Sequence, residues 1–355
     1  MHNDHIPSAP TGGEEPQCGQ PPREPSDEIP SGSGKPRVIA VVGATASGKT
    51  ALAVSLCKRF GGEVISFDSM QIYRGMPVGT AQPTGTETEG VPHHLIGFLS
   101  PDVPFSCAEY VPLAKEKIRE VLSRGKLPVL CGGTGLYLDS LLRGGSFEET
   151  GNDPDYREKL TALAQTHGAD YLHDLLRAVD PESADAIHKN NQKRVIRALE
   201  IYHATGRTKS ELDRASREHG SDYDATVLGI RYADRELLYR RIDERVDRML
   251  ADGLIDEARK LRDAGVFRVN STAAQAIGYK ELFGYLDGTD TLADAAETLK
   301  RATRRYAKRQ ITWFSANPDV HWVTADENGR VRPACEIVSD AERILIDAEG
   351  APPVR

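Results

Sequence analysis

The sequence predicts an α/β protein in which a parallel sheet, flanked by helices, is interrupted by a helical insertion domain. Short apolar runs with β-strand character alternate with segments whose apolar residues recur at helical spacing. A glycine-rich turn over residues 43–50 joins the first such strand to the first helix. Residues 146–222, by contrast, are polar, helical in pattern and without a strand signal.

The composition is that of a soluble globular protein, with 39% hydrophobic and 28% charged residues. The 355 residues leave room for two domains, or for one domain with a large insertion. There is no apolar run long enough for a membrane span and no export signal, so we expect a cytoplasmic protein, and a monomer by default. The five cysteines lack CxxC spacing, which favours reduced thiols over a disulfide framework or a zinc site.

The first predicted strand and helix enclose a phosphate-binding loop. Residues 1–36 are rich in Pro, Gly, Ser and Glu and predict a disordered tail. Residues 38–42 then predict a buried strand, and residues 51–60 a helix, because Leu52 and Leu56 recur at helical spacing. The loop between them predicts a P-loop NTPase-like core. Its residues are Gly43, Ala44, Thr45, Ala46, Ser47, Gly48, Lys49 and Thr50.

Each residue type in this loop has a physical role in holding phosphate. The glycines let backbone N–H groups curl around phosphate oxygens, and the helix N-terminus adds partial positive charge. Lys49 supplies a full charge, and the Thr50 hydroxyl can hold Mg²⁺. An ordinary glycine turn before a helix would not explain why Lys49 and Thr50 follow Gly48 directly.

The later elements divide the chain into regions. Further strands are predicted over residues 64–67, 94–98, 126–131, 227–230 and 320–323. A long helix is predicted from Asp234, and Gly253 marks its break. The predicted regions are the first part of the core (37–145), the helical insertion (146–222), the second part of the core (223–330) and a C-terminal tail (331–355).

Polar residues follow two of these strands, as Asp68 follows 64–67 and Thr134 follows 126–131. Ligands of open α/β sheets bind beyond the carboxyl ends of the strands, so we expect both residues beside the phosphate loop. Asp68 has three possible roles: holding Mg²⁺ through water, acting as a general base, or capping a turn. The adjacent His93 and His94 point to opposite faces of a strand, which favours a structural role over a metal site.

Two groups of cations are candidates for binding anions. Arg245 borders the apolar stripe of its helix, so its partner is either a structural carboxylate or a diphosphate bound in the cleft. The net charge of −8 argues against a nucleic-acid partner, but a local basic face is sufficient for one. At about 100° per residue, the six cations of residues 300–309 fall on one half of a helix, which favours phosphate contact.

Segments throughout the chain together resemble the tRNA dimethylallyltransferase family, also called tRNA isopentenyltransferases, in its bacterial form. They run in family order from about residue 37 to residue 323. The most specific pair is DSMQIYRGM with YAKRQITWF, and the others are GATASGKTALA, VPHHLIGF, GGTGLYLDSLL, NQKRVIRALEIYHATGR, RRIDERVDRMLADGLIDEA and QAIGYKEL.

The resemblance implies a reaction and its partners. Members of the family transfer a dimethylallyl group from dimethylallyl diphosphate to the exocyclic N6 amine of the adenosine just 3′ of the anticodon, releasing diphosphate. Their tRNAs read codons that begin with uridine. The implied cofactor is Mg²⁺, and the implied partner is the tRNA anticodon stem-loop. Because that base is stacked in the loop, it is expected to flip into the site.

The resemblance also assigns residues. It implies that the phosphate loop holds the prenyl diphosphate, that Thr45 contacts it, and that Asp68 is the general base. Lys49, Mg²⁺ on Thr50 and Arg245 would stabilise the leaving diphosphate. The implied tRNA contacts are Asp68, Ser69, Met70, Gln71, Thr134, Gln192, Lys193, Arg194, Val195, Ile196, Gln275, Ala276, Ile277, Gly278, Tyr279, Lys280, Lys308, Arg309, Gln310 and Trp313.

Two departures from the family pattern are present, and the first bears on which acceptor is used. Ala44 stands where many bacterial relatives have proline, and enzymes that prenylate free adenine nucleotides often carry alanine there. Ile96 and Gly97 occupy a segment where an aspartate is common, and no C-terminal zinc finger is present. The alternatives are transfer to free AMP, ADP or ATP, a nucleotide-dependent kinase, and a non-catalytic RNA-binding module.

Overall fold

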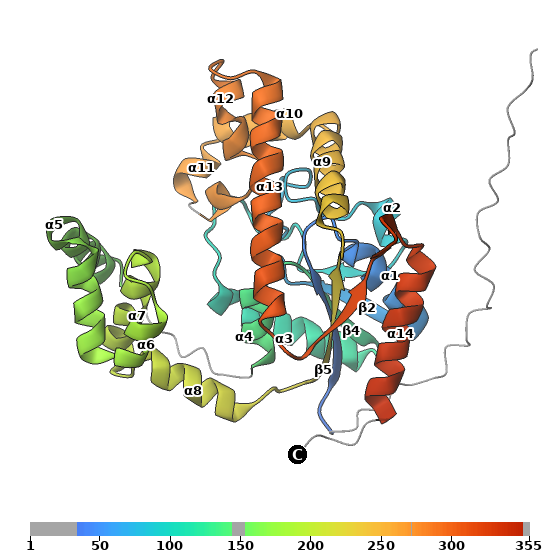
Figure 1. The fold of residues 1–355 in the computed structure, drawn as a ribbon, viewed down its shortest axis with the longest axis horizontal. Helices are drawn as coiled ribbons and strands as arrows, with labels where there is room; N and C mark the ends of the chain where they lie inside the picture. The colour runs from blue at the N-terminus through green and yellow to red at the C-terminus, as the bar shows by residue number, and fades with distance from the viewer. Residues whose placement is uncertain (1–33, 144–152, 271, 351–355) are drawn as a thin grey trace, which may run out of the picture.

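The protein is built on a six-stranded parallel sheet with strand order β3-β2-β4-β1-β5-β6 (Figure 1). The computed structural model describes residues 34–143, 153–270 and 272–350. Its sheet, flanked by helices, confirms the predicted α/β class. The strands are β1 (Arg37–Gly43), β2 (Gly62–Ser66), β3 (His93–His94), β4 (Leu127–Cys131), β5 (Asp224–Arg231) and β6 (Val320–Thr324). A separate antiparallel pair consists of β7 (Asp326–Glu327) and β8 (Arg330–Val331).

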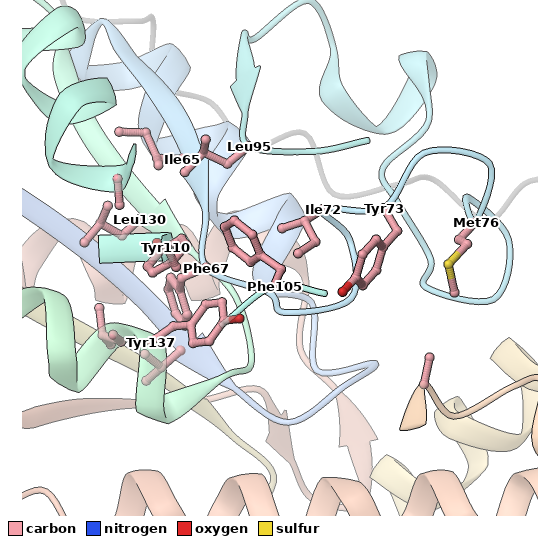
Figure 2. Close-up of a cluster of buried hydrophobic side chains, with 14 of the residues drawn as sticks. Ile65, Phe67, Ile72, Tyr73, Met76, Leu95, Phe105, Tyr110, Leu130 and Tyr137 are labelled. Atoms are coloured by element: carbon pink, nitrogen blue, oxygen red, sulfur yellow. The ribbon is translucent and has the colours of Figure 1, made fainter. Parts of the chain in front are cut away.

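The central strand β1 reads as a continuous apolar run because both faces of the sheet are covered. Val38, Ala40 and Val42 pack into the core on one face, and Ile39 and Val41 pack into the core on the other. The first core includes the side chains that Figure 2 shows between the sheet and the segment after β2. The second core lies under α1 (Lys49–Phe60) and the last helix of the chain.

The helices around the sheet follow its strands and form a group at its carboxyl edge (Figure 1). Helices α3 and α4 cover the face of the first core. Helix α13 packs against α9 and reaches β1 and α4 at the carboxyl edge. The bounds are α2 (Gly85–Thr88), α3 (Cys107–Ser123), α4 (Gly135–Leu142), α9 (Arg235–Ala251), α10 (Leu254–Asp263), α11 (Val266–Val269), α12 (Phe283–Leu286) and α13 (Leu292–Ser315), with 3-10 turns η1 (Ala273–Gln275) and η2 (Lys280–Leu282).

The chain between α4 and β5 forms a helical unit beside the sheet (Figure 1). It has its own small core, which includes Leu160, Leu172 and Leu176. Helix α5 is interrupted at Gly168, whose φ of 87° is open to glycine but costly for other residues. The helices are α5 (Pro154–Val179), α6 (Pro181–Ala186), α7 (Gln192–Thr205) and α8 (Lys209–His219). The predicted insertion start, residues 146–152, lies outside the described residues.

Two sequence-based predictions need correction. The C-terminal tail predicted over 331–355 contains helix α14 (Ala334–Gly350), whose Ala341 and Leu345 are completely buried in the second core. Their i, i+4 spacing is a helical signal that the polar surroundings obscured. The strand predicted over 94–98 is reduced to the two residues of β3, because Leu95 (φ 61°) and Gly97 (φ 59°) take left-handed backbone that ends the pairing. The tail predicted over 1–36 falls outside the described residues up to residue 33.

Replacing Leu345 with alanine tests whether α14 belongs to the core. We expect the free energy of unfolding to fall by about 2–5 kcal/mol, because the substitution opens a cavity under α1. Ile346 is 48% exposed, so Ile346→Ala is the matched control and should change stability by less than about 0.5 kcal/mol. Urea unfolding of both variants measures the difference, and equal midpoints would show that α14 contributes nothing to the core.

Among the described residues, no helix combines the length and the apolar character that crossing a lipid bilayer requires.

Candidate active site

The phosphate loop leaves several of its hydrogen-bond donors without partners, as an anion site requires. Gly48 caps α1 with a φ of 101° and without a side-chain cap. Within the described residues, the amides of Gly48, Lys49 and Thr50 donate to no backbone or side-chain acceptor. The hydroxyl of Ser47 is also buried without a hydrogen-bond partner among them. Because unpaired buried donors are costly, this arrangement is suited to a phosphate group.

Two side chains from distant parts of the sequence fix the shape of the loop. Arg241 on α9 donates from Nε to the carbonyl of Ala46 at 3.0 Å. Gln310 on α13 accepts from the amide of Thr45, with 2.8 Å between Oε1 and N. Sequence reasoning missed the role of Arg241 and gave Gln310 a different one, because both contacts depend on how α9 and α13 cross the sheet edge.

Asp68 follows β2 and uses its two carboxylate oxygens differently. Oδ1 accepts from the amides of Met70 at 2.9 Å and Gln71 at 3.3 Å, which caps the turn. Oδ2 takes part in no hydrogen bond among the described residues. Phe67, the preceding residue, is completely buried in the aromatic group that Figure 2 shows. The turn is therefore anchored, and one oxygen stays free for a ligand.

Thr134 is joined to this turn across the sheet edge. Its Oγ1 accepts from the amide of Ser69 at 3.0 Å and donates to the Ser69 hydroxyl at 3.2 Å. Tyr306 on α13 lies against the same place, and its pKa is raised by burial and by the negative charge of Asp68. The loop, Asp68 and Thr134 thus meet at the carboxyl edge of the sheet, where we expected them.

The electrostatics of the site favour an anion. Burial, with a smaller contribution from the nearby Arg245, lowers the pKa of Lys49 from 10.5 to about 8, against the opposing effects of Cys131 and Asp68. Burial also lowers the pKa of Arg245. Within the described residues, no carboxylate forms an ion pair with Arg245. Of the two partners that the sequence allowed for it, a structural carboxylate or a bound diphosphate, the first is therefore absent from these residues. The charges of Asp68 and Glu87 act on Arg245, but neither carboxylate is hydrogen-bonded to it among the described residues, so a bound anion can still pair with this cation.

The segments expected to contact tRNA divide into exposed and buried residues. Those with exposed side chains are Gln192, Lys193, Arg194, Gln275, Lys280, Lys308, Arg309 and Trp313. Those that are buried are Val195, Ile196, Ala276, Gly278, Tyr279 and Gln310, while Ile277, Ser69, Met70, Gln71 and Thr134 are intermediate. The side chains of Val195, Ile196, Ala276 and Tyr279 pack in protein cores, and that of Gln310 is hydrogen-bonded to two loops. We therefore narrow the expected surface contacts to the exposed set.

The basic face predicted over 300–309 contains fewer exposed cations in the structure than the sequence predicted. Lys300 pairs with Asp247 at 2.6 Å, and Arg304 pairs with Asp243 at 2.7 Å, so both cations hold α13 against α9. Arg301, Arg305, Lys308 and Arg309 remain exposed along one stripe of α13, which we call the basic stripe. The sequence placed all six on one half of the helix but gave no sign of the acidic partners on α9.

A cavity of about 560 Å³ lies elsewhere, in the helical insertion, where its lining includes Asp170, His173 and Lys189. Its walls carry neither the phosphate loop nor Asp68. The site is therefore identified by convergent polar groups rather than by cavity volume.

Comparison with known proteins gives a consistent result. The family model described as IPP transferase matches residues 71–317, and that described as isopentenyl transferase matches residues 36–96. A tRNA dimethylallyltransferase of Bacillus velezensis is 52% identical over 289 residues, covering 81% of this chain and 90% of the relative. That of Bacillus subtilis is 51% identical over 289 residues, with the same coverage of both chains.

Solved structures extend the similarity to three dimensions. The tRNA isopentenylpyrophosphate transferase of Bacillus halodurans aligns with a TM-score of 0.64 at 45% identity, covering 88% of this chain and 98% of that one. A eukaryotic dimethylallyltransferase acting on tRNA aligns with a TM-score of 0.75 at 28% identity, covering 88% and 80%. By its sequence, its fold and the groups at its sheet edge, the chain belongs to the tRNA dimethylallyltransferase family of prenyltransferases.

Proposed function

We propose that this protein transfers the dimethylallyl group of dimethylallyl diphosphate to the N6 amine of the adenosine just 3′ of the anticodon, in tRNAs that read codons beginning with uridine. One observation carries the proposal: an anion loop with unpaired donors lies beside a carboxylate that keeps Oδ2 free. The proposed displacement needs the loop to hold its anionic leaving group, and it needs the carboxylate to accept the proton that the amine loses. Family membership supplies the identity of the two substrates.

The chemistry follows from these groups. The amine lone pair forms a bond to the first carbon of the allyl group while the bond from that carbon to the diphosphate oxygen breaks. Asp68 takes the amine proton on Oδ2, so the product nitrogen is neutral. Lys49, Arg245 and the loop amides stabilise the charge that grows on the diphosphate, and the Thr45 side chain contacts it. Before this step the adenine leaves the stacked bases of the anticodon loop and flips into the site.

The residues present are compatible with Mg²⁺. Among the described residues, no three His, Cys, Asp or Glu side chains form a metal cluster, so protein carboxylates alone do not complete a site. Magnesium commonly takes few protein ligands and fills its shell with phosphate oxygens and water. The Thr50 hydroxyl at the start of α1 would hold it, and the buried, unpartnered Ser47 hydroxyl belongs to the same loop. When bound, the ion would add positive charge against the leaving diphosphate.

An acceptor panel tests the proposal. The protein is incubated with dimethylallyl diphosphate, Mg²⁺ and either unmodified tRNA, AMP, ADP or ATP, and the nucleosides are analysed by mass. We expect prenylated adenosine from the tRNA alone, in keeping with the helical insertion and the basic stripe. Product from the free nucleotides with none from tRNA would instead support the alternative acceptor. Consumption of ATP as a phosphoryl donor would support the kinase.

The lowered pKa of Lys49 makes diphosphate binding depend on pH. The ammonium attracts the diphosphate, and with a pKa of about 8 it loses its proton near that pH rather than near 10.5. We expect the affinity for a thiolodiphosphate analogue of the donor to fall as pH rises through about 8, by at most about tenfold per pH unit. Lys49→Arg keeps its charge and is the control. A wild-type profile as flat as that of Lys49→Arg would contradict this prediction.

The basic stripe is expected to set the salt dependence of tRNA binding. Replacing both Lys308 and Arg309 with alanine removes two exposed cations and should lower the slope of log K against log salt by about 2. The exposed Arg330 on β8 lies outside the basic stripe and supplies the control Arg330→Ala. Filter binding over a salt series measures the slopes, and identical slopes for all three proteins would remove the stripe from the tRNA interface.

A further inference from the structure

Gln310 joins the two halves of the site. Its side chain is 5% exposed and lies on the face of α13 that meets the sheet. Oε1 accepts from the Thr45 amide at 2.8 Å, and Nε2 donates to the Gly133 carbonyl at 3.0 Å. One amide group therefore bridges the phosphate loop and the turn that follows β4, with its acceptor and one donor both used.

The bridge continues to the carboxylate. Thr134, the neighbour of Gly133, is hydrogen-bonded to Ser69 at 3.0 Å, and Ser69 is the neighbour of Asp68. A chain of short contacts thus runs from Thr45, through Gln310 and Thr134, to Asp68. Its links are three directional hydrogen bonds between partly or fully buried groups and two peptide linkages, so the chain fixes distances rather than merely filling space.

The backbone beneath the bridge is shaped for this side chain. A Cβ at Gly133 would lie 2.1 Å from Gln310 Nε2 and 3.9 Å from Asp68 Oδ2. Only glycine allows the amide to come so close to the main chain. The same helix carries the basic stripe on its opposite, exposed side.

We propose that Gln310 is a positioning residue, not a surface tRNA contact: its side-chain amide sets the spacing between the diphosphate held at Thr45 and the base Asp68. This inference rests on the proposed function. A nucleophilic displacement is sensitive to such spacing, and an error of about 1 Å costs on the order of 100-fold in rate. Loss of the bridge should therefore lower kcat and leave the exposed tRNA contacts intact.

The pH dependence of kcat in Gln310→Glu distinguishes a positioning role from a purely structural one. The ionised carboxylate can accept from the Thr45 amide but cannot donate to Gly133, whereas the protonated acid can do both, as the native amide does. Burial and the neighbouring Asp68 favour the protonated form, while Lys49 and Arg245 oppose it, and Tyr306 faces the same position. The ratio of variant to wild-type kcat should therefore rise as pH falls, since titration of the native groups is common to both proteins.

The experiment measures kcat, tRNA affinity and melting temperature for wild type, Gln310→Glu, Gln310→Met and Gly133→Ala. We expect kcat about 10–100-fold lower in the variants, tRNA affinity within about threefold, and partial rescue at low pH in Gln310→Glu alone. Gln165 is exposed on α5, so Gln165→Met is the matched control and should leave all three unchanged.

The outcomes separate this inference from the proposed function. An inactive wild-type protein overturns both. An active wild type with unaltered kcat in Gln310→Met and Gly133→Ala overturns the positioning role alone. Loss of tRNA affinity that equals the loss of kcat makes Gln310 a binding residue, and a pH-independent defect in Gln310→Glu shows that the donor to Gly133 is not what matters.

Discussion

Replacing Asp68 with asparagine is expected to lower prenyl transfer by about 10²–10⁴-fold. The asparagine Oδ1 can still accept from the amides of Met70 and Gln71, so the turn keeps its shape. What the variant loses is the free Oδ2, which takes the amine proton in the proposed reaction. Single-turnover assays with saturating tRNA and donor measure the chemical step, and filter binding should give a tRNA affinity within a few-fold of wild type.

Two further variants make this result specific. Asp68→Ala also removes the turn cap and should be no more active than Asp68→Asn, with a lower melting temperature. Asp102 is an exposed loop aspartate that accepts from Ser100, and Asp102→Asn should turn over normally. Wild-type turnover in Asp68→Asn would remove Asp68 from the proton transfer and leave it as a structural cap.

Replacing Lys49 with methionine is expected to lower kcat by about 10²–10³-fold, because the ammonium opposes the charge that grows on the leaving diphosphate. The same change should not lower the melting temperature. Burial disfavours the charged form of Lys49, as its lowered pKa shows, and its ammonium bonds only to the Ala44 carbonyl at 2.7 Å among the described residues. Loss of activity without loss of stability would separate catalysis from folding.

Lys58 on the same helix is the matched control for this substitution. Its ammonium is exposed and pairs with Glu89, so Lys58→Met should alter neither kcat nor stability by a measurable amount. If Lys49→Met kept its activity, Arg245 and Mg²⁺ would have to stabilise the diphosphate without Lys49. If the Lys49→Met variant lost activity and also had a lower melting temperature, the loop would depend on Lys49 for its shape.

The sequence was most informative where local chemistry determines structure. The phosphate loop could be predicted because its glycines, Lys49 and Thr50 act together over eight adjacent residues, between a strand and a helix. The parallel sheet could be predicted because strands buried on both faces are apolar throughout, as β1 is. Asp68 could be placed beside the loop because carboxyl ends of parallel strands share one edge.

The features that could not be predicted depend on tertiary contacts. Arg241 reaches Ala46 across 195 residues of sequence, and Gln310 reaches Thr45 across 265. Nothing in the composition of α9 or α13 indicates these partners. The acidic residues of α9 are also far in sequence from their partners, with a separation of 61 positions between Asp243 and Arg304, which is why the basic face was predicted too wide. The spacing of Ala341 and Leu345 was a local signal for helix α14, but the polar residues around it obscured that signal.

The most direct test is a single turnover with the wild-type protein in excess over unmodified tRNA, in the presence of dimethylallyl diphosphate and Mg²⁺. We expect diphosphate and prenylated nucleoside to appear at the same rate and in equal amounts, with the group on N6 of the adenosine just 3′ of the anticodon. Diphosphate released without a modified nucleoside, or a group placed on another base, would contradict this expectation.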